Sequence, residues 1–331
     1  MKKKRFASLL LVAPLALLAA CSNTPALTLE SNWFADTSRK TIPDDFEETL
    51  EYAVSFEKST SALNGAFSVD YPNGGTYKTK LEDGEVDGKK TYVFTTELKI
   101  GAQYTLNGVS SEIMDEVVTT RVEFYDVANE MRPLSSVREA TVTYPTTYPT
   151  SPPAALETGY RKEHYKVELD YNWETEKALY TYTDLASEET AKTPKTKEIG
   201  VGGKGSYFDN QQLALVLRAT ELSSATSFRL IDITSESHES ITVKEGPSAV
   251  TFKQRVKYKT DEEAVERDYN AYEVGIALNK RNSGPTQKYT FAQRGSRDSN
   301  THRNVLLKYD VPIIYSHGTL SYRLTVANFY G

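Results

Sequence analysis

Residues 164–185 read HYKVELDYNWETEKALYTYTDL, and their pattern decides the fold class. In the first half of this stretch, apolar and polar side chains alternate strictly. The apolar set is Tyr165, Val167, Leu169, Tyr171 and Trp173. Alternation with a period of two places these side chains on one face of a half-buried β-strand. After the polar residues 174–177, the pattern resumes over 178–185, which is predicted to return as an antiparallel strand.

Similar alternation recurs through most of the chain. Tyrosine, with 22 copies, adds to the preference for sheet. The further predicted strands lie within residues 49–58, 67–82, 89–100, 116–126, 136–144, 227–233, 249–259, 268–278, 287–293, 304–310 and 318–327. In the range 67–82, the sequence Pro72-Asn73-Gly74-Gly75 predicts a turn between two strands.

One segment departs from this pattern. Residues 209–222, DNQQLALVLRATEL, favour a helix over 209–221, with Asp209 or Asn210 as its N-cap. The acidic stretch 261–268 predicts a loop or a short helix. A single helix is too small to cover so many strands. The sequence therefore predicts a mainly β fold of curved antiparallel sheet, arranged as a half-barrel, a barrel or a sandwich.

Prolines suggest how the chain is divided. Residues 144–159, YPTTYPTSPPAALETG, contain four prolines, which cannot donate to a sheet ladder. We expect a first β region over 49–144, a proline-rich connection over 145–159, and a second β region with the helix over 160–331. Residues 21–48 are expected to form a tether, from which Trp33 and Phe34 could dock onto the domain. The pattern leaves open whether the two β regions form one domain.

The N-terminus has the form of an export signal. Four basic residues precede an apolar run of about 15 residues, which is shorter than the ~20 needed to span a bilayer. The only cysteine, Cys21, follows directly after LAA. This stretch resembles the lipobox of bacterial lipoproteins, which implies cleavage after residue 20 and lipidation of Cys21. Two or three acyl chains would anchor the protein stably to a membrane.

Export would leave an acidic chain. Removing residues 1–20 takes away four of the 39 basic residues and none of the 45 acidic ones, so the formal net charge changes from −6 to −10. Such a charge disfavours nucleic acid or anionic lipid as a general partner. We expect a protein on the extracytoplasmic face of the bacterial cell envelope, with the membrane as a partner through its lipid. The oligomeric state and the choice of inner or outer membrane stay open.

Two short motifs suggest ion binding, and we prefer a structural interpretation of both. Residues 83–88, DGEVDG, place three carboxylates at alternate positions, but no carboxylate stands at loop position twelve, where a calcium loop requires one. We expect a hairpin turn. Gly200, Gly202 and Gly205 have a spacing found in phosphate-binding loops, but no strong strand precedes them and the helix begins several residues late. We expect a flexible loop.

A row of cations is the remaining candidate binding surface. Lys253, Arg255, Lys257 and Lys259 share one face of a predicted strand. They could bind an anionic polymer or headgroup. The alternative we favour is a solvated face, paired with acids of the next strand such as Glu273. The four histidines lack the spacing of a zinc site, and no nucleophile motif is present. We therefore predict no metal, no cofactor and no catalytic residue.

Several stretches together resemble an uncharacterised family of exported β-rich bacterial proteins, known only as a domain of unknown function. They are LEYAVSF (50–56), TTRVEFYDVANEMRPLSS (119–136), YFDNQQLALVLRATEL (207–222) and NVLLKYDVPIIYSHGTLSYRL (304–324). The match runs from about residue 49 to 328. The resemblance implies a fold similar to periplasmic lipoprotein carriers, in which an open curved sheet wraps a helix. It implies no catalytic residues.

The leading hypothesis is thus a lipid-anchored binding or structural protein. A second hypothesis is a carrier or sensor of an apolar ligand, held in a cavity lined by residues such as Tyr165, Leu169, Leu213 and Leu217. Surface glycan binding through tyrosines and an unrecognised hydrolase are further alternatives. The deciding observation is whether the folded sheet encloses a cavity of ligand size.

Overall fold

The computed structural model describes the greater part of the chain after the predicted signal. The described residues are 27–30, 33, 45–59, 67–106, 108–145, 160–185, 194–202, 206–224, 226–234, 237–279, 286–293, 305–313 and 318–330. Cys21, the predicted signal over 1–20, Phe34, and residues 146–159 of the predicted connection lie outside them.

The described residues form 17 strands joined in one sheet. Those before residue 200 are β1 (Glu47–Lys58), β2 (Phe67–Asp70), β3 (Gly75–Val86), β4 (Lys89–Leu106), β5 (Val109–Ser110), β6 (Met114–Tyr125), β7 (Pro133–Pro145), β8 (Tyr160–Asn172), β9 (Lys177–Asp184) and β10 (Lys195–Gly200). Those after it are β11 (Tyr207–Asp209), β12 (Ser227–Asp232), β13 (Ser237–Tyr258), β14 (Val265–Asn279), β15 (Thr286–Ala292), β16 (Leu306–Pro312) and β17 (Gly318–Tyr330). The helical segments are the 3₁₀ turns η1 (Val127–Asn129) and η2 (Asn210–Gln212) and the helix α1 (Leu213–Ala219).

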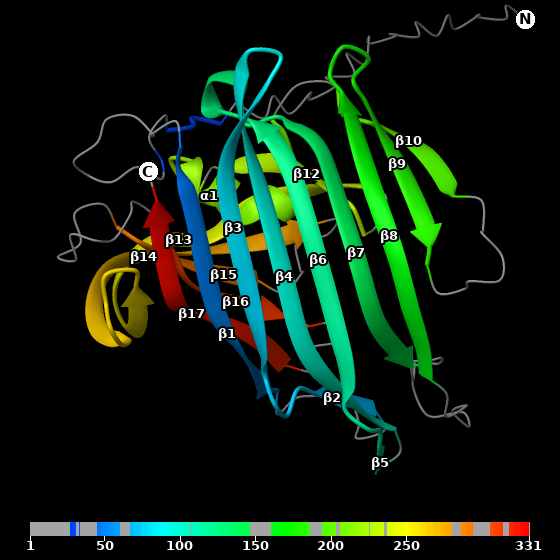
Figure 1. Cartoon of the computed structure of the whole chain (residues 1–331), viewed down its shortest axis with the longest axis vertical. Coiled ribbons are helices and arrows are strands. Elements are labelled where there is room, and N and C mark those ends of the chain that lie inside the picture. The colour runs from blue at the N-terminus through cyan, green and yellow to red at the C-terminus, as the bar shows by residue number, and fades with distance from the viewer. Residues whose placement is uncertain are drawn as a thin grey trace, which may run out of the picture.

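A long antiparallel meander forms the front layer of the molecule (Figure 1). Strands β3, β4, β6, β7, β8, β9 and β10 pair in that order, and β1 pairs with β3 on the other side. The β8–β9 hairpin is the one predicted from residues 164–185. The pairing of β7 with β8 runs from Ser135 opposite Asp170 to Pro145 opposite Tyr160, so strands from both predicted β regions share one sheet.

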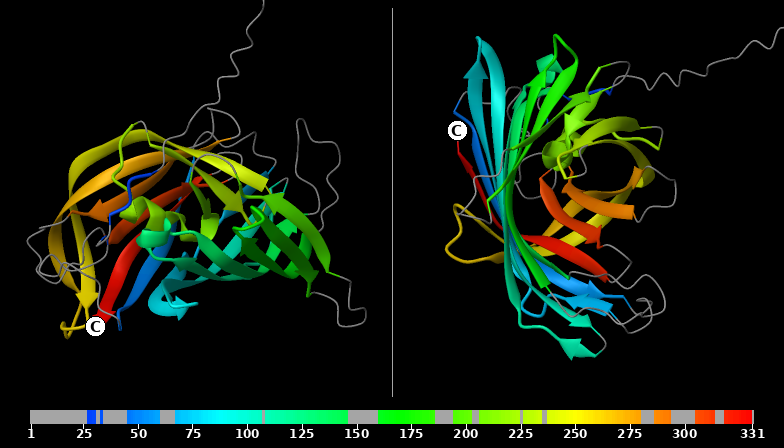
Figure 2. Two further views of the ribbon diagram at one scale, coloured as in Figure 1. Left: turned by 90° about the horizontal axis from the view of Figure 1, so that it is seen from above. Right: turned by 90° about the vertical axis from the view of Figure 1, so that its right-hand side faces the viewer.

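The sheet then curls back over itself. From β1 the pairing continues through β17, β16, β15, β14 and β13 to β12 and β11. Lys257 and Tyr258 of β13 also pair in parallel with Val326 and Ala327 of β17, which closes β13–β17 into a ring. Figure 2 shows these strands arching behind the front layer, with α1 between the arch and the front layer. The predicted mainly β class with one helix is confirmed.

Two details of the predicted strand arrangement differ. The β11–β12 and β13–β17 pairings are parallel, so the sheet is mixed and not purely antiparallel. The predicted turn at 72–75 is present, and Gly74 takes a positive φ of 60° there, which glycine adopts without strain. Across that turn, however, β2 pairs with β4 while β3 pairs with β1 and β4. Of the acidic stretch 261–268, residues 261–264 lie in the turn before β14, whereas residues 265–268 are the first residues of that strand and not a loop or helix.

The helix is shorter than its sequence pattern predicts. Asp209 caps it as expected, since its carboxylate accepts a hydrogen bond from the Gln211 amide, but the first turn is 3₁₀ and α1 begins only at Leu213. At the other end, Thr220 is extended because it pairs with Leu29 in an isolated bridge. The helix therefore ends at Ala219, two residues before the predicted end at Glu221.

Two apolar cores lie on the concave side of the sheet. The larger joins α1 to β1, β3, β4 and the strands β12–β17, and it contains the fully buried Trp33 of the N-terminal segment. The smaller one fills the space between β8–β10 and β12, with Leu169 and Ile231 at its centre. Among the described residues, no helix is both long and apolar enough to cross a membrane.

Candidate functional site

A cavity of about 400 Å³ lies between α1 and the concave face of the sheet. We call it the inner cavity. Its apolar lining is Leu50, Phe94, Leu213, Ala214, Leu215, Leu230, Leu306 and Val311. Its aromatic and polar lining includes Tyr52, Tyr77, Thr79, Tyr289, Tyr309, Arg138, Asn210, Gln211, Asp232, Thr234, Glu239 and Gln287. The fold creates this space because a seven-residue helix cannot fill the width of the curled sheet.

Tyrosines from separate strands form one wall of the inner cavity. Tyr77 lies 5.7 Å from Tyr52 and 6.1 Å from Tyr309 between ring centroids. Tyr309 stacks on Tyr322 at 4.1 Å and on Tyr289 at 5.5 Å. Offset and edge-to-face aromatic contacts of this kind hold the rings in fixed positions. The wall is therefore apolar over the ring faces and polar at the hydroxyl groups.

Burial keeps these hydroxyl groups protonated. It raises the pKa of Tyr322 to about 12, where the hydrogen bond with Tyr309 acts in the opposite direction. Burial is also the largest cause that raises the pKa values of Tyr52, Tyr77, Tyr289 and Tyr309. Tyr52 donates its hydroxyl hydrogen to the Leu306 carbonyl at 2.9 Å, and Tyr289 donates to Gln287 Oε1 at 2.8 Å. The oxygens of these neutral phenols can still accept hydrogen bonds, so the wall can serve both an apolar chain and a polar donor.

An ion pair fixes the end of α1 against the first strand. Arg218 Nη1 lies 2.8 Å from Glu48 Oε1, and both side chains are only 2% exposed. The guanidinium carbon of Arg218 also stands 5.4 Å from the ring centroid of Trp33, in cation–π geometry. Glu48 and Arg218 both line the inner cavity. Because the pair balances its own charge, it contributes little net field to the cavity.

A second cavity of about 670 Å³ adjoins the first, and we call it the outer cavity. It is lined by Arg138, Tyr144, Arg161, Glu163, Tyr165, Val167, Tyr180, Tyr182, Ile233 and Thr234. Arg138 and Thr234 line both cavities, so the two meet there. The rings of Tyr165 and Tyr182 stack at 5.7 Å along one wall. Together the cavities form a groove that begins under the helix and continues over β7–β9.

Arg138 stands at the junction of the two cavities. On the concave face of β7, it lies opposite Thr120 of β6 and Val167 of β8, and neither can neutralise a charge. Its Nε is buried and has no hydrogen-bond partner among the described residues. Arg161, the other cation of the outer cavity, forms an ion pair with Glu163. Arg138 is thus the cation of the groove that forms no ion pair with a described residue.

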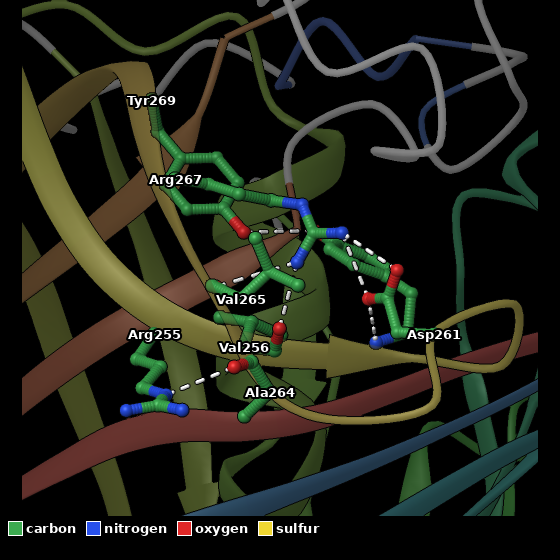
Figure 3. Close-up of polar contacts among 8 residues, drawn as sticks. Arg255, Val256, Asp261, Ala264, Val265, Arg267 and Tyr269 are labelled. Carbon is green, nitrogen blue, oxygen red and sulfur yellow. Dashed lines mark hydrogen bonds and ion pairs between the residues drawn. The ribbon is translucent and has the colours of Figure 1, made fainter.

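The predicted cation row lies on the ring of strands and not at this groove. Lys253 forms an ion pair with Glu266 at 2.9 Å, and Arg255 donates to the carbonyl of Ala264 at 2.9 Å (Figure 3). Lys259 lies 3.8 Å from the centroid of the Tyr330 ring. Lys257 is exposed at the same strand end. These are the contacts of a solvated face, the interpretation we favoured from sequence.

The prediction that Glu273 pairs with this row of cations was wrong. The β13–β14 hairpin closes at Val256 opposite Val265, so Lys253 stands opposite Asp268, whereas Glu273 stands opposite Ser248. Glu273 instead approaches Lys288 at 3.7 Å. The hairpin is held by Arg267, which forms two hydrogen bonds of 2.9 and 2.8 Å with Asp261 (Figure 3).

The structure describes residues 83–88 in full, and of the glycine-rich loop it describes Gly200 and Gly202. Within 83–88, Asp87 and Gly88 make the two-residue turn between β3 and β4, both with positive φ, as expected for a hairpin. No group of three or more His, Cys, Asp or Glu residues that could hold a metal occurs among the described residues. In the glycine-rich loop, Gly205 lies outside them.

The glycine-rich loop is preceded by a strand, which the sequence did not indicate. Strand β10 ends at Gly200 and pairs antiparallel with β9. Beyond it, a Cβ on Gly202 would lie only 2.0 Å from the carboxylate of Glu176, so the glycine allows close packing on the β8–β9 turn. His238 bonds the Gly200 carbonyl, and His164 lies 2.9 Å from Glu139. His302 and His317 lie outside the described residues.

The lining proposed from sequence was correct in part. Tyr165 lines the outer cavity and Leu213 the inner one. Leu169 and Leu217, in contrast, are fully buried within the two cores. Sequence reasoning missed Arg138 and the tyrosine wall, although the alternation in SVREATVTY already placed Arg138 on the face of Ser136 and Ala140.

Comparison of the chain with protein-family models, curated proteins and solved structures finds no match.

Proposed function

We propose that this protein is a lipid-anchored component of the bacterial cell envelope that binds an apolar ligand between its curled sheet and helix. The inner cavity is the observation that carries the binding part of the proposal. Its volume of about 400 Å³ falls within the range of roughly 300–1,000 Å³ that is typical of small-molecule sites. The N-terminal resemblance to a lipobox supports the anchoring part.

The size of the inner cavity argues that it is a site and not a packing defect. Protein interiors contain few voids larger than a water molecule. A space of about 400 Å³ is far larger than such voids, and because it is partly open to solvent, water fills it in the free protein. Water can form hydrogen bonds on the tyrosine and carboxylate side of the cavity, but the side chains of Leu50, Leu306 and Val311 offer it no hydrogen-bond partner. An apolar chain would satisfy that wall.

Filling the inner cavity is expected to abolish binding of an apolar probe. Ala214 is half-buried on α1 and lines the cavity, so Ala214→Trp would occupy the space of the ligand. We expect the affinity for the uncharged fluorophore N-phenylnaphthylamine to fall by about 10-fold or more, equivalent to ~1.4 kcal/mol. Fluorescence titration of the mature chain measures this change.

Ala53→Trp provides a matched control, since Ala53 is exposed on β1. This variant is expected to bind the probe as the parent does, and circular dichroism would establish that both variants are folded. Equal affinity of the parent and Ala214→Trp for the probe would contradict the proposal. Native mass spectrometry of gently extracted protein would add a direct test, with a copurifying lipid as the expected result.

The anchoring part predicts complete dependence of membrane association on Cys21. With residues 1–20 replaced by a general secretory signal, Cys21→Ala is expected to be exported, cleaved and recovered in the soluble fraction, because its only acceptor for lipid is gone. Ser22→Ala behind the native signal keeps the thiol and should fractionate with membranes and incorporate labelled palmitate. Membrane association of the cleaved Cys21→Ala chain would refute a lipid anchor.

A further inference from the structure

Arg138 lies where a charge is costly unless something neutralises it. It is half-buried, its Nε is inaccessible to solvent, and no described residue forms a hydrogen bond with that atom. A buried cation without a partner is strongly unfavourable, and proteins usually pair such groups or place them where a ligand pairs them. The unsatisfied Nε therefore leaves a donor for an anion that the described residues do not supply.

The other cations of the groove are already paired. In the inner cavity, Arg218 is bound to Glu48, while Asp232, which accepts hydrogen bonds from Asn210 and Thr234, and Glu239 are further carboxylates of the lining. Among the described residues of the outer cavity, Arg161 is paired with Glu163. Arg138 is therefore the cation of the groove that forms no ion pair with a described residue, and it stands where the two cavities meet.

Neighbouring groups place this charge between an apolar and a polar region. The positive charge of Arg138 lowers the pKa of Tyr144 in the outer cavity and of Tyr322 behind the inner one, although burial raises both overall. Arg138 thus acts electrostatically on both sides of the junction. The inner cavity carries most of the aliphatic side chains of the groove, with Asp232 and Glu239 among its polar ones, while in the outer cavity Tyr144 and Tyr165 offer hydroxyl groups.

We propose that Arg138 binds the acidic group of an amphiphilic ligand, a carboxylate or a phosphate, whose acyl chain lies in the inner cavity. This inference rests on the proposed function and names the class of ligand. A guanidinium is well suited to the task, since its planar donors match carboxylate and phosphate oxygens and it stays charged at all physiological pH values. An uncharged chain would fill the cavity but leave Arg138 unpaired.

The test compares ligands that share a twelve-carbon chain and differ only in the headgroup. Dodecanoic acid, dodecyl phosphate and dodecanol are titrated against bound N-phenylnaphthylamine. We expect the acid and the phosphate to displace it at concentrations about 10- to 100-fold lower than dodecanol, as one charge-assisted hydrogen-bonding contact provides. Arg138→Met, which keeps the length of the side chain, should remove this preference, so that the acid, the phosphate and dodecanol displace the probe at similar concentrations.

Controls separate the possible outcomes. Arg161→Met removes a cation from the same cavity, but one already paired with Glu163, so the preference for acidic headgroups should persist. Circular dichroism establishes that Arg138→Met is folded; if it does not fold, Arg138→Gln replaces it. Equal displacement by dodecanoic acid and dodecanol in the parent, or a preference that survives in Arg138→Met, would overturn the assignment of Arg138 while leaving the apolar site intact.

Two further measurements distinguish an amphiphilic ligand from a free anion, and a failure of this inference from a failure of the proposed function. Inorganic phosphate alone should not displace the probe at concentrations where dodecyl phosphate does, because it cannot use the apolar wall. Displacement by inorganic phosphate at those concentrations would mean a small-anion site and overturn the inference. Absence of probe binding by the parent would instead reject the proposed function itself.

Discussion

Arg218→Met is expected to lower the free energy of unfolding by about 3–5 kcal/mol, because it leaves the carboxylate of Glu48 buried without its counter-charge. Both side chains are 2% exposed, so water cannot take the place of the guanidinium. The second oxygen of Glu48 has no hydrogen-bond partner among the described residues, which makes the carboxylate dependent on the single bond of 2.8 Å to Arg218. Urea unfolding of the mature chain would measure the loss.

The double variant Glu48→Met/Arg218→Met distinguishes charge from packing. Replacing both members of a buried pair with apolar residues is often neutral, because the desolvation cost of the two ions disappears together with their attraction. We expect the double variant to recover most of the lost stability. The remaining deficit would report the cation–π contact of Arg218 with Trp33, which is worth about 1–2 kcal/mol when desolvated.

A surface ion pair serves as the comparison. Lys78 and Glu51 are 2.8 Å apart, the same distance as the buried pair, but both are about half exposed. Lys78→Met is expected to change stability by less than about 1 kcal/mol, since exposed pairs are screened by solvent. If the Arg218 and Lys78 variants lost similar stability, burial would not be the reason for the effect, and the ion pair would not fix the helix to β1.

The sequence predicted what depends on neighbours along the chain. Alternation in residues 164–173 identified a strand and the face that it buries, because both follow from the two-residue period. Asp209 was identified as a cap because its role needs only the next two residues. The curl of the sheet was also foreseen in outline, since a helix of this size cannot cover so many strands.

Features that depend on long-range pairing were missed. The helix ends early because Thr220 pairs with Leu29, a contact that no local pattern encodes. Glu273 was assigned to the cation row from a register that the hairpin at Val256 and Val265 does not have. Arg138 was visible only as one of several alternating residues. Its isolation follows from the register of β6, β7 and β8, which brings Thr120 and Val167 beside it.

Asp209→Ala is also expected to destabilise the fold severely, by about 3–5 kcal/mol. The carboxylate of Asp209 is fully buried and accepts hydrogen bonds from Ser136 Oγ at 2.5 Å, Tyr171 Oη at 2.6 Å and the Gln211 amide at 2.8 Å. Alanine would remove a helix cap worth about 1 kcal/mol and leave two buried hydroxyl groups without an acceptor, at about 1–3 kcal/mol each. The start of α1 would then lose its attachment to β7 and β8.

Asp209→Asn separates hydrogen bonding from charge. Its amide oxygen can still accept from Gln211 and from one hydroxyl, so we expect a smaller loss of about 1–2 kcal/mol at pH 7. Ser136→Ala removes one donor and should leave the carboxylate held by the other two, at a cost of about 1 kcal/mol. An Asp209→Ala variant no less stable than Ser136→Ala would show that the cap does not organise this end of the helix.

The pH dependence of the parent and Asp209→Asn gives the sharpest test. Burial raises the pKa of Asp209 above its ordinary value of 3.8, against the three hydrogen bonds that lower it. Because the folded state then binds the proton more tightly than the unfolded state, this residue's contribution is fully present below pH 3.8 and is lost as the pH rises through the folded pKa. Asparagine does not titrate. The stability advantage of the parent over Asp209→Asn should therefore be larger near pH 4 than at pH 7, as measured by urea unfolding at both values. A difference that grew with increasing pH would mean that the hydrogen bonds from Ser136, Tyr171 and Gln211 outweigh the cost of burying the charge.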